Sequence, residues 1–474
     1  MTQETRTQKG QSTLELIIAL AIIAITMASI IALFFGGQSL LIDTQTAQEG
    51  GYLLRQSLEE ARSLARTNFA GLVSTSSNIG DFTLERTVNI LDEHTKQVIE
   101  QITWATDPIR EQELELVAVL TDWRNVIPPV DPDDPPGGSP SGDWMNPRTL
   151  GSIDVIPSGN QGTGVDVVGT FAYITAEMPS ADKPDFFVAD VSNPRPHQSP
   201  IASLNTGPGL NAVDATIGYA YVANRSNTQQ LQIINISNPG SPSLVTGFTL
   251  PGTSGPNAIG QSIFYASPYV YVGAGSASGP EFHIVNVGTP DSPVSAGYLE
   301  IGSAVNAIAV QNRKAYLGTS DVNEEIKIID VSDPALPTQI GGYNIPSNGA
   351  AVALVLQGDT LFVTRNSNSD KELFVFNVSD PDAVQSLGSK EFTADVPGLE
   401  VQNCLAFIGS TNSNKEFQVH NVDDPGDIEE WSSFNFPQVV TDIDYSNNLV
   451  YTAVRSNEAL RIITSATSSV PTCQ

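Results

Sequence analysis

One phrase recurs along most of the chain: a short apolar run, then Asp or Asn, then a proline corner. Its six copies end at Pro194, Pro239, Pro290, Pro334, Pro381 and Pro425, and the fourth copy reads IKIIDVSDP. Successive prolines are 44 to 51 residues apart. Tandem repeats of this length, with several short strands and no helical pattern, are typical of β-propellers. The sequence therefore predicts a ring of blades over residues 145–474 rather than a solenoid.

A second phrase, rich in aromatic and small apolar residues, sets the number of blades. It begins near residues 171, 219, 269, 314, 360, 404 and 449, which makes seven copies. The second unit shows its strands most clearly, near 210–215, 218–224, 230–236 and 243–249. Each blade is therefore expected to be a four-stranded antiparallel sheet, because the runs are short and bounded by turn residues.

The seventh unit lacks a fourth strand of its own. Its expected strands lie near 439–445, 448–454 and 459–464, after which the chain ends in SSVPTCQ. Residues 148–156 (RTLGSIDVI) form a strand-like segment with no place in the first blade. The simplest closure has this N-terminal strand completing the last blade, which removes open sheet edges.

The apolar–Asp phrase, seen as IIDVSDP, resembles the LVIVD-type propeller repeat. The resemblance covers about residues 148–468 and implies an all-β, seven-bladed propeller. Such a repeat indicates shape and says little about the ligand, because one fold supports many functions.

The N-terminal part of the chain has a different character. Residues 14–35 form an apolar run of 22 residues whose one charge is Glu15. At about 1.5 Å per residue, a helix of this length spans roughly 33 Å and crosses a bilayer. Arg6 and Lys9 precede the run and favour a cytoplasmic start. One interpretation is a plain membrane anchor, with Glu15 near the headgroups at the helix N-terminus.

The residues around Glu15 suggest a second interpretation. The sequence KGQSTLE at residues 9–15, followed by the apolar run, resembles the class III signal of type IV prepilins and pseudopilins. The resemblance implies cleavage between Gly10 and Gln11 by a prepilin peptidase, with N-methylation of the new terminus. Glu15 would then pair with the terminal amine of a neighbouring subunit, which offsets the cost of burying a carboxylate. Gln11 departs from the Phe or Met usual at the first mature position.

The pilin resemblance covers about residues 5–125. It implies a leader at 1–10, a long transmembrane and filament-core α-helix at 11–68, and a small antiparallel sheet at 69–126. The glycine pairs at 36–37 and 50–51 should loosen the helix. Alternating apolar residues predict strands at 82–91, 97–106 and 113–123.

Residues 127–144 are dominated by Pro, Gly and Asp and predict an extended spacer between the two parts. Asp131, Asp133 and Asp134 are conceivable calcium ligands. The neighbouring prolines prevent the chain from wrapping an ion, so a solvated linker is favoured.

The charge balance narrows the classes of partner that the chain can bind. The chain has 22 Lys and Arg against 52 Asp and Glu, a net charge of −30, which disfavours nucleic-acid binding. Cys404 and Cys473 are the two cysteines, too few for a cysteine-rich metal site. Because strand direction alternates within a blade, the expected strands place both cysteines on the propeller face where the linker enters. We therefore expect a Cys404–Cys473 disulfide, with two free thiols as the alternative.

The sequence contains no pattern for catalysis. The histidines at 94, 197, 283 and 420 lack metal-site spacing, and no nucleotide-binding or serine-hydrolase motif occurs. One Asp or Asn recurs before each proline corner, at Asp190, Asn235, Asn286, Asp330, Asn377 and Asn421. These side chains form either a ring of polar groups for an active site or a set of turn caps. Recurrence in six blades favours turn caps. We expect no enzyme activity, metal or cofactor.

Polar loops should gather on the propeller face opposite the linker. They lie at 176–184, 224–230, 274–280, 319–325, 365–371, 410–415 and 455–458. Loops on a rigid scaffold often carry binding, and a surface receptor, glycan or protein is the expected partner. The alternative is that these loops are simply solvated turns.

Three functions fit these features. The first is a minor or tip pilin of a type IV pilus-like filament that presents the propeller for adhesion. It would reside in the inner membrane as a precursor and at the cell surface after assembly with other pilin subunits. The second is a pseudopilin of a type II secretion-like apparatus. The third is a membrane-tethered extracytoplasmic propeller protein that does not polymerise.

Overall fold

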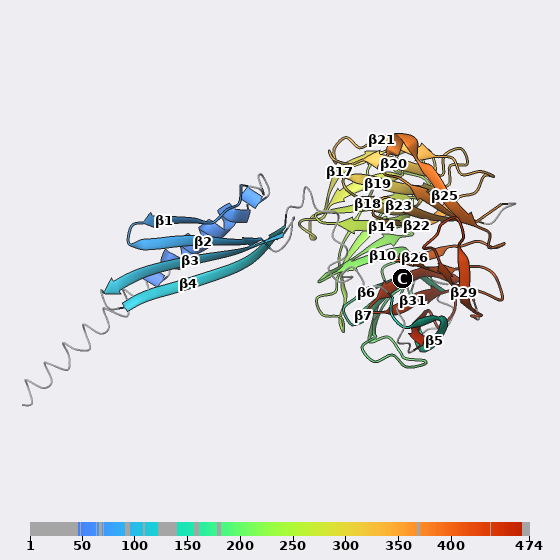
Figure 1. Cartoon of the computed structure of the whole chain (residues 1–474), viewed down its shortest axis with the longest axis horizontal. Helices are drawn as coiled ribbons and strands as arrows, with labels where there is room; N and C mark the ends of the chain where they lie inside the picture. The colour runs from blue at the N-terminus through green and yellow to red at the C-terminus, as the bar shows by residue number, and fades with distance from the viewer. Residues whose placement is uncertain are drawn as a thin grey trace, which may run out of the picture. The chain divides into compact units, whose positions relative to one another are not determined.

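The computed structural model divides the chain into two compact units, residues 1–126 and 127–474 (Figure 1). It describes residues 46–47, 49–62, 64–65, 69, 71–90, 95–107, 110–121, 140–155, 161–177, 182–366, 370–436 and 438–466.

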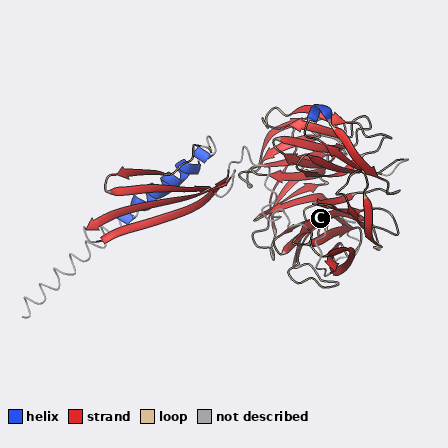
Figure 2. Ribbon diagram, in the orientation of Figure 1, coloured by secondary structure: helices blue, strands red, loops and turns tan. Residues whose placement is uncertain are grey.

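The first unit is a helix on an antiparallel sheet (Figure 2). The helix covers residues 49–62, with further helical residues at 46–47 and 64–65. The sheet has the order β1 (Thr75–Ile79), β2 (Phe82–Ile90), β3 (Thr95–Asp107) and β4 (Arg110–Thr121). Strands β2 to β4 occupy the segments predicted for them. Strand β1 was not predicted, because its sequence TSSNI is polar and wholly exposed at the sheet edge.

Apolar side chains hold the helix on the sheet in two clusters. Leu54 packs against Phe82, Ile102 and Trp104, and Ala61 lies with Val98 in the second cluster. Apolar and polar residues alternate along the strands, as expected for a sheet with one face buried. The apolar side of this sheet therefore faces the helix.

A charged network lies between the helix and the sheet. Glu100 on β3 is 0% exposed. The Ser57 hydroxyl on the helix donates to Glu100 Oε2 at 2.6 Å, and Arg86 Nε on β2 donates to Oε1 at 2.5 Å. Arg86 also donates to the Ser57 carbonyl oxygen at 2.8 Å. The buried carboxylate is thus neutralised by a cation and satisfied by hydrogen bonds, the condition under which burial of a charge is tolerated.

The expected fold class, with one long α-helix over residues 11–68, was wrong. The described chain is nearly all β: it holds eight four-stranded sheets, and its helix spans 49–62. No helix among the described residues has the length and apolar character needed to span a membrane.

The glycine pair at 50–51 lies inside this helix and does not interrupt it. A Cβ on Gly50 would lie 3.2 Å from the Phe82 ring and 3.3 Å from the Trp104 ring. Gly50 therefore lets the helix approach the sheet closely, which outweighs its low helix propensity.

The second unit is a β-propeller of seven four-stranded blades (Figure 1). Blades one to three consist of β6 (Gln161–Val168), β7 (Phe171–Glu177), β8 (Phe186–Asp190), β9 (Ala202–Leu204); β10 (Leu210–Thr216), β11 (Tyr219–Asn224), β12 (Leu231–Asn235), β13 (Ser243–Phe248); and β14 (Gly260–Ala266), β15 (Tyr269–Ala274), β16 (Phe282–Asn286), β17 (Val294–Leu299). Blades four and five consist of β18 (Val305–Gln311), β19 (Lys314–Thr319), β20 (Ile326–Asp330), β21 (Thr338–Tyr343); and β22 (Ala351–Gln357), β23 (Thr360–Arg365), β24 (Leu373–Asn377), β25 (Gln385–Lys390), with the 3-10 turn η1 (Pro381–Ala383) before β25. Blades six and seven consist of β26 (Gly398–Gln402), β27 (Leu405–Gly409), β28 (Phe417–Asn421), β29 (Glu429–Phe434); and β30 (Val440–Ser446), β31 (Leu449–Val454), β32 (Leu460–Ala466), β5 (Asp143–Ile153).

The predicted closure of the ring is confirmed. Strand β5 pairs antiparallel with β32, from Ile153 opposite Leu460 to Asp143 opposite Ala466. The strand begins at Asp143, earlier than predicted, because Trp144 anchors its start. The Trp144 ring is 0% exposed, and its centroid lies 4.9 Å from that of Phe407 in blade six.

The chain enters the propeller beside the first-to-second turn of blade seven. The Ser141 amide donates to Asn448 Oδ1 at 2.9 Å, and Asn448 Nδ2 donates back to the Ser141 carbonyl oxygen at 3.1 Å. Asn448 lies in the turn between β30 and β31. The entry face is therefore the one built from first-to-second turns, as the strand parity predicted.

Blades three to six contact one another closely at a glycine in the fourth strand. A Cβ on Gly297, Gly341 or Gly388 would lie 1.6 to 2.1 Å from the carbonyl oxygen of the proline in the next blade's repeat phrase. Those prolines are Pro334, Pro381 and Pro425. The backbone of one blade thus touches the proline corner of the next, and only glycine leaves room for that approach.

Candidate functional site

The residues predicted for processing and assembly, Gly10, Gln11 and Glu15, lie outside the described residues. Leader cleavage and filament pairing therefore stay predictions.

Cys404 lies in the first-to-second turn of blade six and is disulfide-bonded. It is 6% exposed and packs in the same cluster as Trp144, near the chain entry. The chain has two cysteines, and the second, Cys473, lies outside the described residues. The pairing of Cys404 with Cys473 stays a prediction that mass mapping can check.

The recurring Asp and Asn residues before the proline corners are turn caps. In each of six blades the side-chain oxygen accepts a hydrogen bond from the amide two residues later, as Asp190 does from Ser192 at 2.9 Å and Asn286 from Gly288 at 2.9 Å. The same bond is made by Asn235, Asp330, Asn377 and Asn421. The hydrogen bond to Ser192 holds the pKa of Asp190 below its ordinary value. These side chains serve the fold rather than forming an active-site ring.

A second recurring polar position was not predicted from the sequence. The residue before the third strand is a buried acid or amide in six blades: Asp185, Gln230, Glu281, Glu325, Glu372 and Glu416, each 0 to 5% exposed. Its side-chain oxygen accepts a hydrogen bond from the backbone amide that follows the fourth strand. Examples are Thr206 to Asp185 at 2.7 Å and Ile345 to Glu325 at 2.7 Å. The only sequence signal was recurrence at one repeat position.

Burial shifts the pKa of two of these acids, Asp185 and Glu281. Desolvation raises the pKa of Asp185 to about 6, although the hydrogen bonds from Thr206 act to lower it. Desolvation also raises the pKa of Glu281. Arg365 is 0% exposed and donates to the carbonyl oxygens of Lys371 and Pro346. Glu325 and Glu372 are among the charges that act on Arg365. In six of the seven blades, the buried side chain thus ties the third strand to the end of its own blade.

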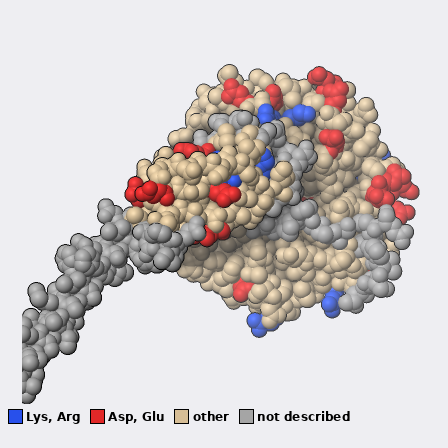
Figure 3. All heavy atoms as spheres, turned by 60° about the vertical axis from the view of Figure 1, so that its left-hand side comes forward, with Lys and Arg blue, Asp and Glu red and all other residues tan. Residues whose placement is uncertain are grey.

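The polar loops predicted as a contact face are held by local interactions. Arg225 pairs with Glu177 of the neighbouring blade at 2.7 Å, and Lys327 contacts Asp321 at 3.0 Å and Glu324 at 2.8 Å. On the side of the molecule drawn in Figure 3, acidic side chains lie in several separate groups. The described residues of this face therefore form loops that are held in place by local contacts.

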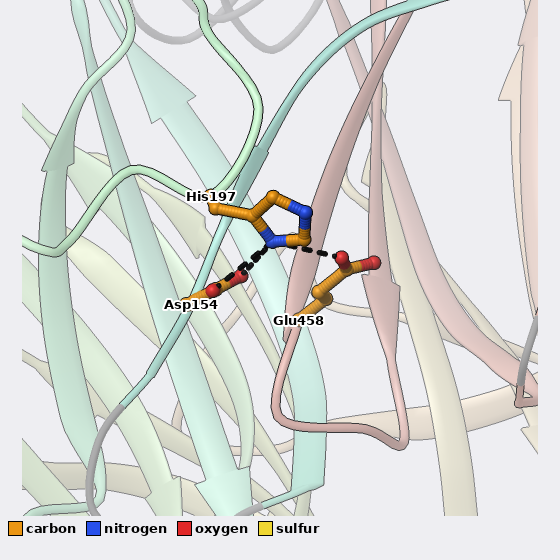
Figure 4. Close-up of side chains that lie close together, drawn as sticks. All are labelled: Asp154, His197 and Glu458. Carbon is orange, nitrogen blue, oxygen red and sulfur yellow. Dashed lines mark hydrogen bonds and ion pairs between the residues drawn. The ribbon is translucent and has the colours of Figure 1, made fainter.

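Asp154, His197 and Glu458 converge at the closure of the ring (Figure 4). Asp154 follows β5, Glu458 lies in the loop between β31 and β32, and His197 belongs to the connection between β8 and β9 of blade one. His197 Nδ1 lies 3.2 Å from Asp154 Oδ2 and 3.1 Å from Glu458 Oε1. We call the junction between blades seven and one the closure seam, and these residues the seam triad.

The backbone of blade one places His197 at the seam. The Ser152 amide donates to the Arg195 carbonyl oxygen at 3.1 Å, and the Asp154 amide donates to that of Gln198 at 2.7 Å. The Gln198 amide donates back to the Ser152 carbonyl oxygen at 2.9 Å. This segment covers the outer edge of β5, which would otherwise be open for pairing with another chain.

The other described histidines are buried in the blades. His283 is 0% exposed and its Nε2 lies 2.8 Å from Thr253 Oγ1; His420 is 1% exposed and lies 3.2 Å from Gln418 Oε1. Desolvation lowers the pKa of each to about 4, so both rings are neutral near pH 7. They are structural residues, and His94 lies outside the described residues.

Comparison with known families identifies the repeat. Residues 213–249 and 304–345 match the LVIVD repeat. These stretches lie in blades two and four, and the second contains the IIDVSDP copy. The predicted resemblance to LVIVD-type propeller repeats is therefore confirmed. No curated protein matches the chain.

Three solved structures are similar to this chain. A chain of a structure titled "Crystal Structure of Mitotic Checkpoint Complex" matches with a TM-score of 0.50 and 12% identity, over 72% of this chain and 98% of that chain. The WD40 domain of Pan2 from Neurospora crassa matches with a TM-score of 0.48 and 10% identity, over 70% and 99% of the two chains. A protein from Lactobacillus plantarum gives a TM-score of 0.46 and 15% identity over 59% and 87%. At such identities the first match indicates a shared propeller fold and no shared function.

Proposed function

We propose that this chain is a minor or tip pilin that presents its β-propeller on a type IV pilus-like filament. The observation that carries the proposal is the order of parts. A prepilin-like cleavage signal at Gly10 and Gln11 precedes a helix packed on a four-stranded antiparallel sheet, and a proline-rich spacer then leads to the propeller.

The first unit supports a protein-assembly role rather than chemistry. Its interior holds apolar clusters and one neutralised carboxylate, Glu100, which is locked by Arg86 and Ser57. Its described residues include no group of His, Cys, Asp and Glu arranged for metal binding. A compact unit of this kind is suited to stand at the head of an assembly subunit.

The propeller supports the presenting role. Its chain entry lies beside Asn448 on the face of first-to-second turns, so the loops between second and third strands lie on the opposite face. That face includes the ordered loops around Arg225, Lys327 and Lys415. A surface receptor, a glycan or a protein would dock there. A disulfide at Cys404 suits an oxidising compartment.

The proposal is tested on filaments. The chain is expressed with a prepilin peptidase and a filament-forming pilin system, and sheared filaments are labelled with gold-conjugated antibody against the propeller. Label on the filaments, lost in a Glu15→Ala variant that is still made in normal amount, is the expected result. Propeller that stays in the cell envelope while filaments form without label would overturn the proposal and favour a pseudopilin or a tethered protein.

A further inference from the structure

The strongest unassigned site is the seam triad. Blade one carries an insertion that creates it: β9 begins eight residues after Pro194, whereas in the other five blades with this proline the fourth strand begins four residues after it. The inserted residues include His197. The ring therefore departs from its own repeat at the joint where its two ends meet.

The three side chains lie close enough together to share one metal ion, because one ligand atom of each lies within 4.8 Å of the other two. Three carboxylate oxygens approach one ring nitrogen: Asp154 Oδ1 and Oδ2 at 3.3 and 3.2 Å, and Glu458 Oε1 at 3.1 Å from His197 Nδ1. One N–H cannot donate well to two carboxylates in different directions. A metal ion bound by all three residues satisfies both, because zinc sites hold ligands at about 2.0–2.2 Å, so that neighbouring ligand atoms lie roughly 3.4 Å apart.

The surroundings orient the ligands. Glu458 uses Oε2 to accept a hydrogen bond from Arg461 Nη2, which leaves Oε1 directed at the His197 ring. The His197 amide donates to Ser152 Oγ at 2.9 Å, and φ at His197 is 57°, a left-handed conformation held by the surrounding hydrogen bonds. Carboxylates that ligate metals are commonly oriented by such outer hydrogen bonds.

We propose that Asp154, His197 and Glu458 bind a divalent transition-metal ion of the zinc class, which fastens the closure seam. The imidazole ligand favours zinc over calcium or magnesium, which prefer oxygen ligands. The ion would join blade one to two parts of blade seven: the loop between its second and third strands, which carries Glu458, and the end of its outer strand, which carries Asp154. The His197 side chain is 65% exposed, so the ion has a path from solvent and keeps a position for water.

The first test is binding of Zn²⁺ alone to the full chain, purified in detergent and stripped of metal, by titration calorimetry near neutral pH. The expected result is saturable binding of one ion per chain, with much weaker binding of Ca²⁺. His197→Ala and His197→Gln should weaken binding at least about tenfold. Glu430→Gln is the matched control, because it breaks an exposed pair with Lys415 away from the seam and should leave binding unchanged.

The second test is the melting temperature of the propeller. Zn²⁺ should raise it by a few degrees in the wild type and in Glu430→Gln, and by nothing in either His197 variant, since a ligand stabilises the state that binds it. Binding that persists in both His197 variants, or bound zinc that leaves the melting temperature unchanged, would overturn the inference. Neither outcome bears on the filament proposal, which does not involve the metal.

Discussion

Gly388 in blade five lies directly against the carbonyl oxygen of Pro425 in blade six, where an added Cβ would come within 1.6 Å of that oxygen. Gly388→Ala should therefore push the two blades apart and destabilise the propeller by about 1–3 kcal/mol, the usual cost of overpacking. Urea unfolding followed by tryptophan fluorescence measures the change.

Gly240→Ala provides the control for this substitution. A Cβ there would meet only Asn238 Oδ1 at 3.6 Å, an ordinary contact, and its φ is outside the left-handed region. We expect it to be neutral or slightly stabilising, because alanine restricts the unfolded chain. Equal stability of the two variants would show that the blade junction is not held by the glycine–proline contact.

The buried network in the first unit gives a second prediction. Arg86→Met leaves Glu100, which is 0% exposed, without its cation. Breaking one side of a buried pair typically costs 3–5 kcal/mol, so unfolding of the first unit should move to much lower urea. The double variant Arg86→Met with Glu100→Met should recover most of the loss.

Arg62→Met supplies the comparison for that network. The Arg62–Glu59 pair is on the helix surface, with side chains 44% and 67% exposed, and such pairs contribute about 0–1 kcal/mol. Similar losses in Arg62→Met and Arg86→Met would mean that the Glu100 network does not stabilise the fold.

The raised pKa of Asp185 predicts a pH effect. Burial raises this pKa from an ordinary value of 3.8 to about 6, so the folded state binds a proton more tightly than the unfolded state. Its contribution to stability is present below pH 3.8 and is lost as the pH rises through about 6. Asp185→Asn should therefore match the wild type near pH 4 and be more stable near pH 7.

Comparing Asp185→Asn with the wild type separates the effect of Asp185 from that of other groups that titrate in the same pH range. His283 and His420, with pKa values lowered to about 4, weaken the fold as the pH falls from their ordinary value of 6.5. They do so equally in both proteins, so the difference between variant and wild type reports Asp185. Blade two already carries an amide, Gln230, at this position. A stability difference that does not change with pH would refute the assignment.

The Cys404 disulfide is checked by peptide mapping. Digestion without reduction should release a peptide pair that joins residues around Cys404 to the C-terminal peptide with Cys473, and reduction should separate them. A Cys404→Ser variant should lower the melting temperature, since a disulfide that closes a long loop contributes about 2–4 kcal/mol. Two thiols that alkylate freely in the native protein would rule out the pairing.

The propeller was largely predictable because its signals are local and repeated. A missing fourth strand in the seventh unit pointed to a closing strand, and β5 fills that place. The turn caps such as Asp190 were also readable, because their partner is two residues away. The expected interruption of the helix at Gly50 and Gly51 was wrong, since the sequence did not show that Gly50 lies against Phe82 and Trp104 of the sheet.

The seam triad and the buried acids were beyond the sequence for one physical reason. Each depends on partners distant along the chain, such as Asp154 for His197 or Thr206 for Asp185. A glutamate in a polar loop looks solvent-exposed until the fold turns it inward, as it does Glu325. The traces left in the sequence were a recurring acid before the third strand and an insertion after Pro194.

The central claim, that a pilin-like subunit carries this propeller, is tested most directly at the N-terminus. The chain is produced with and without a prepilin peptidase, and the mature N-terminus is read by mass spectrometry. We predict a chain that begins at Gln11 only when the peptidase is present, and an uncut chain in a Gly10→Val variant. An intact Gly10–Gln11 bond in the wild type, with active peptidase present, would contradict the account.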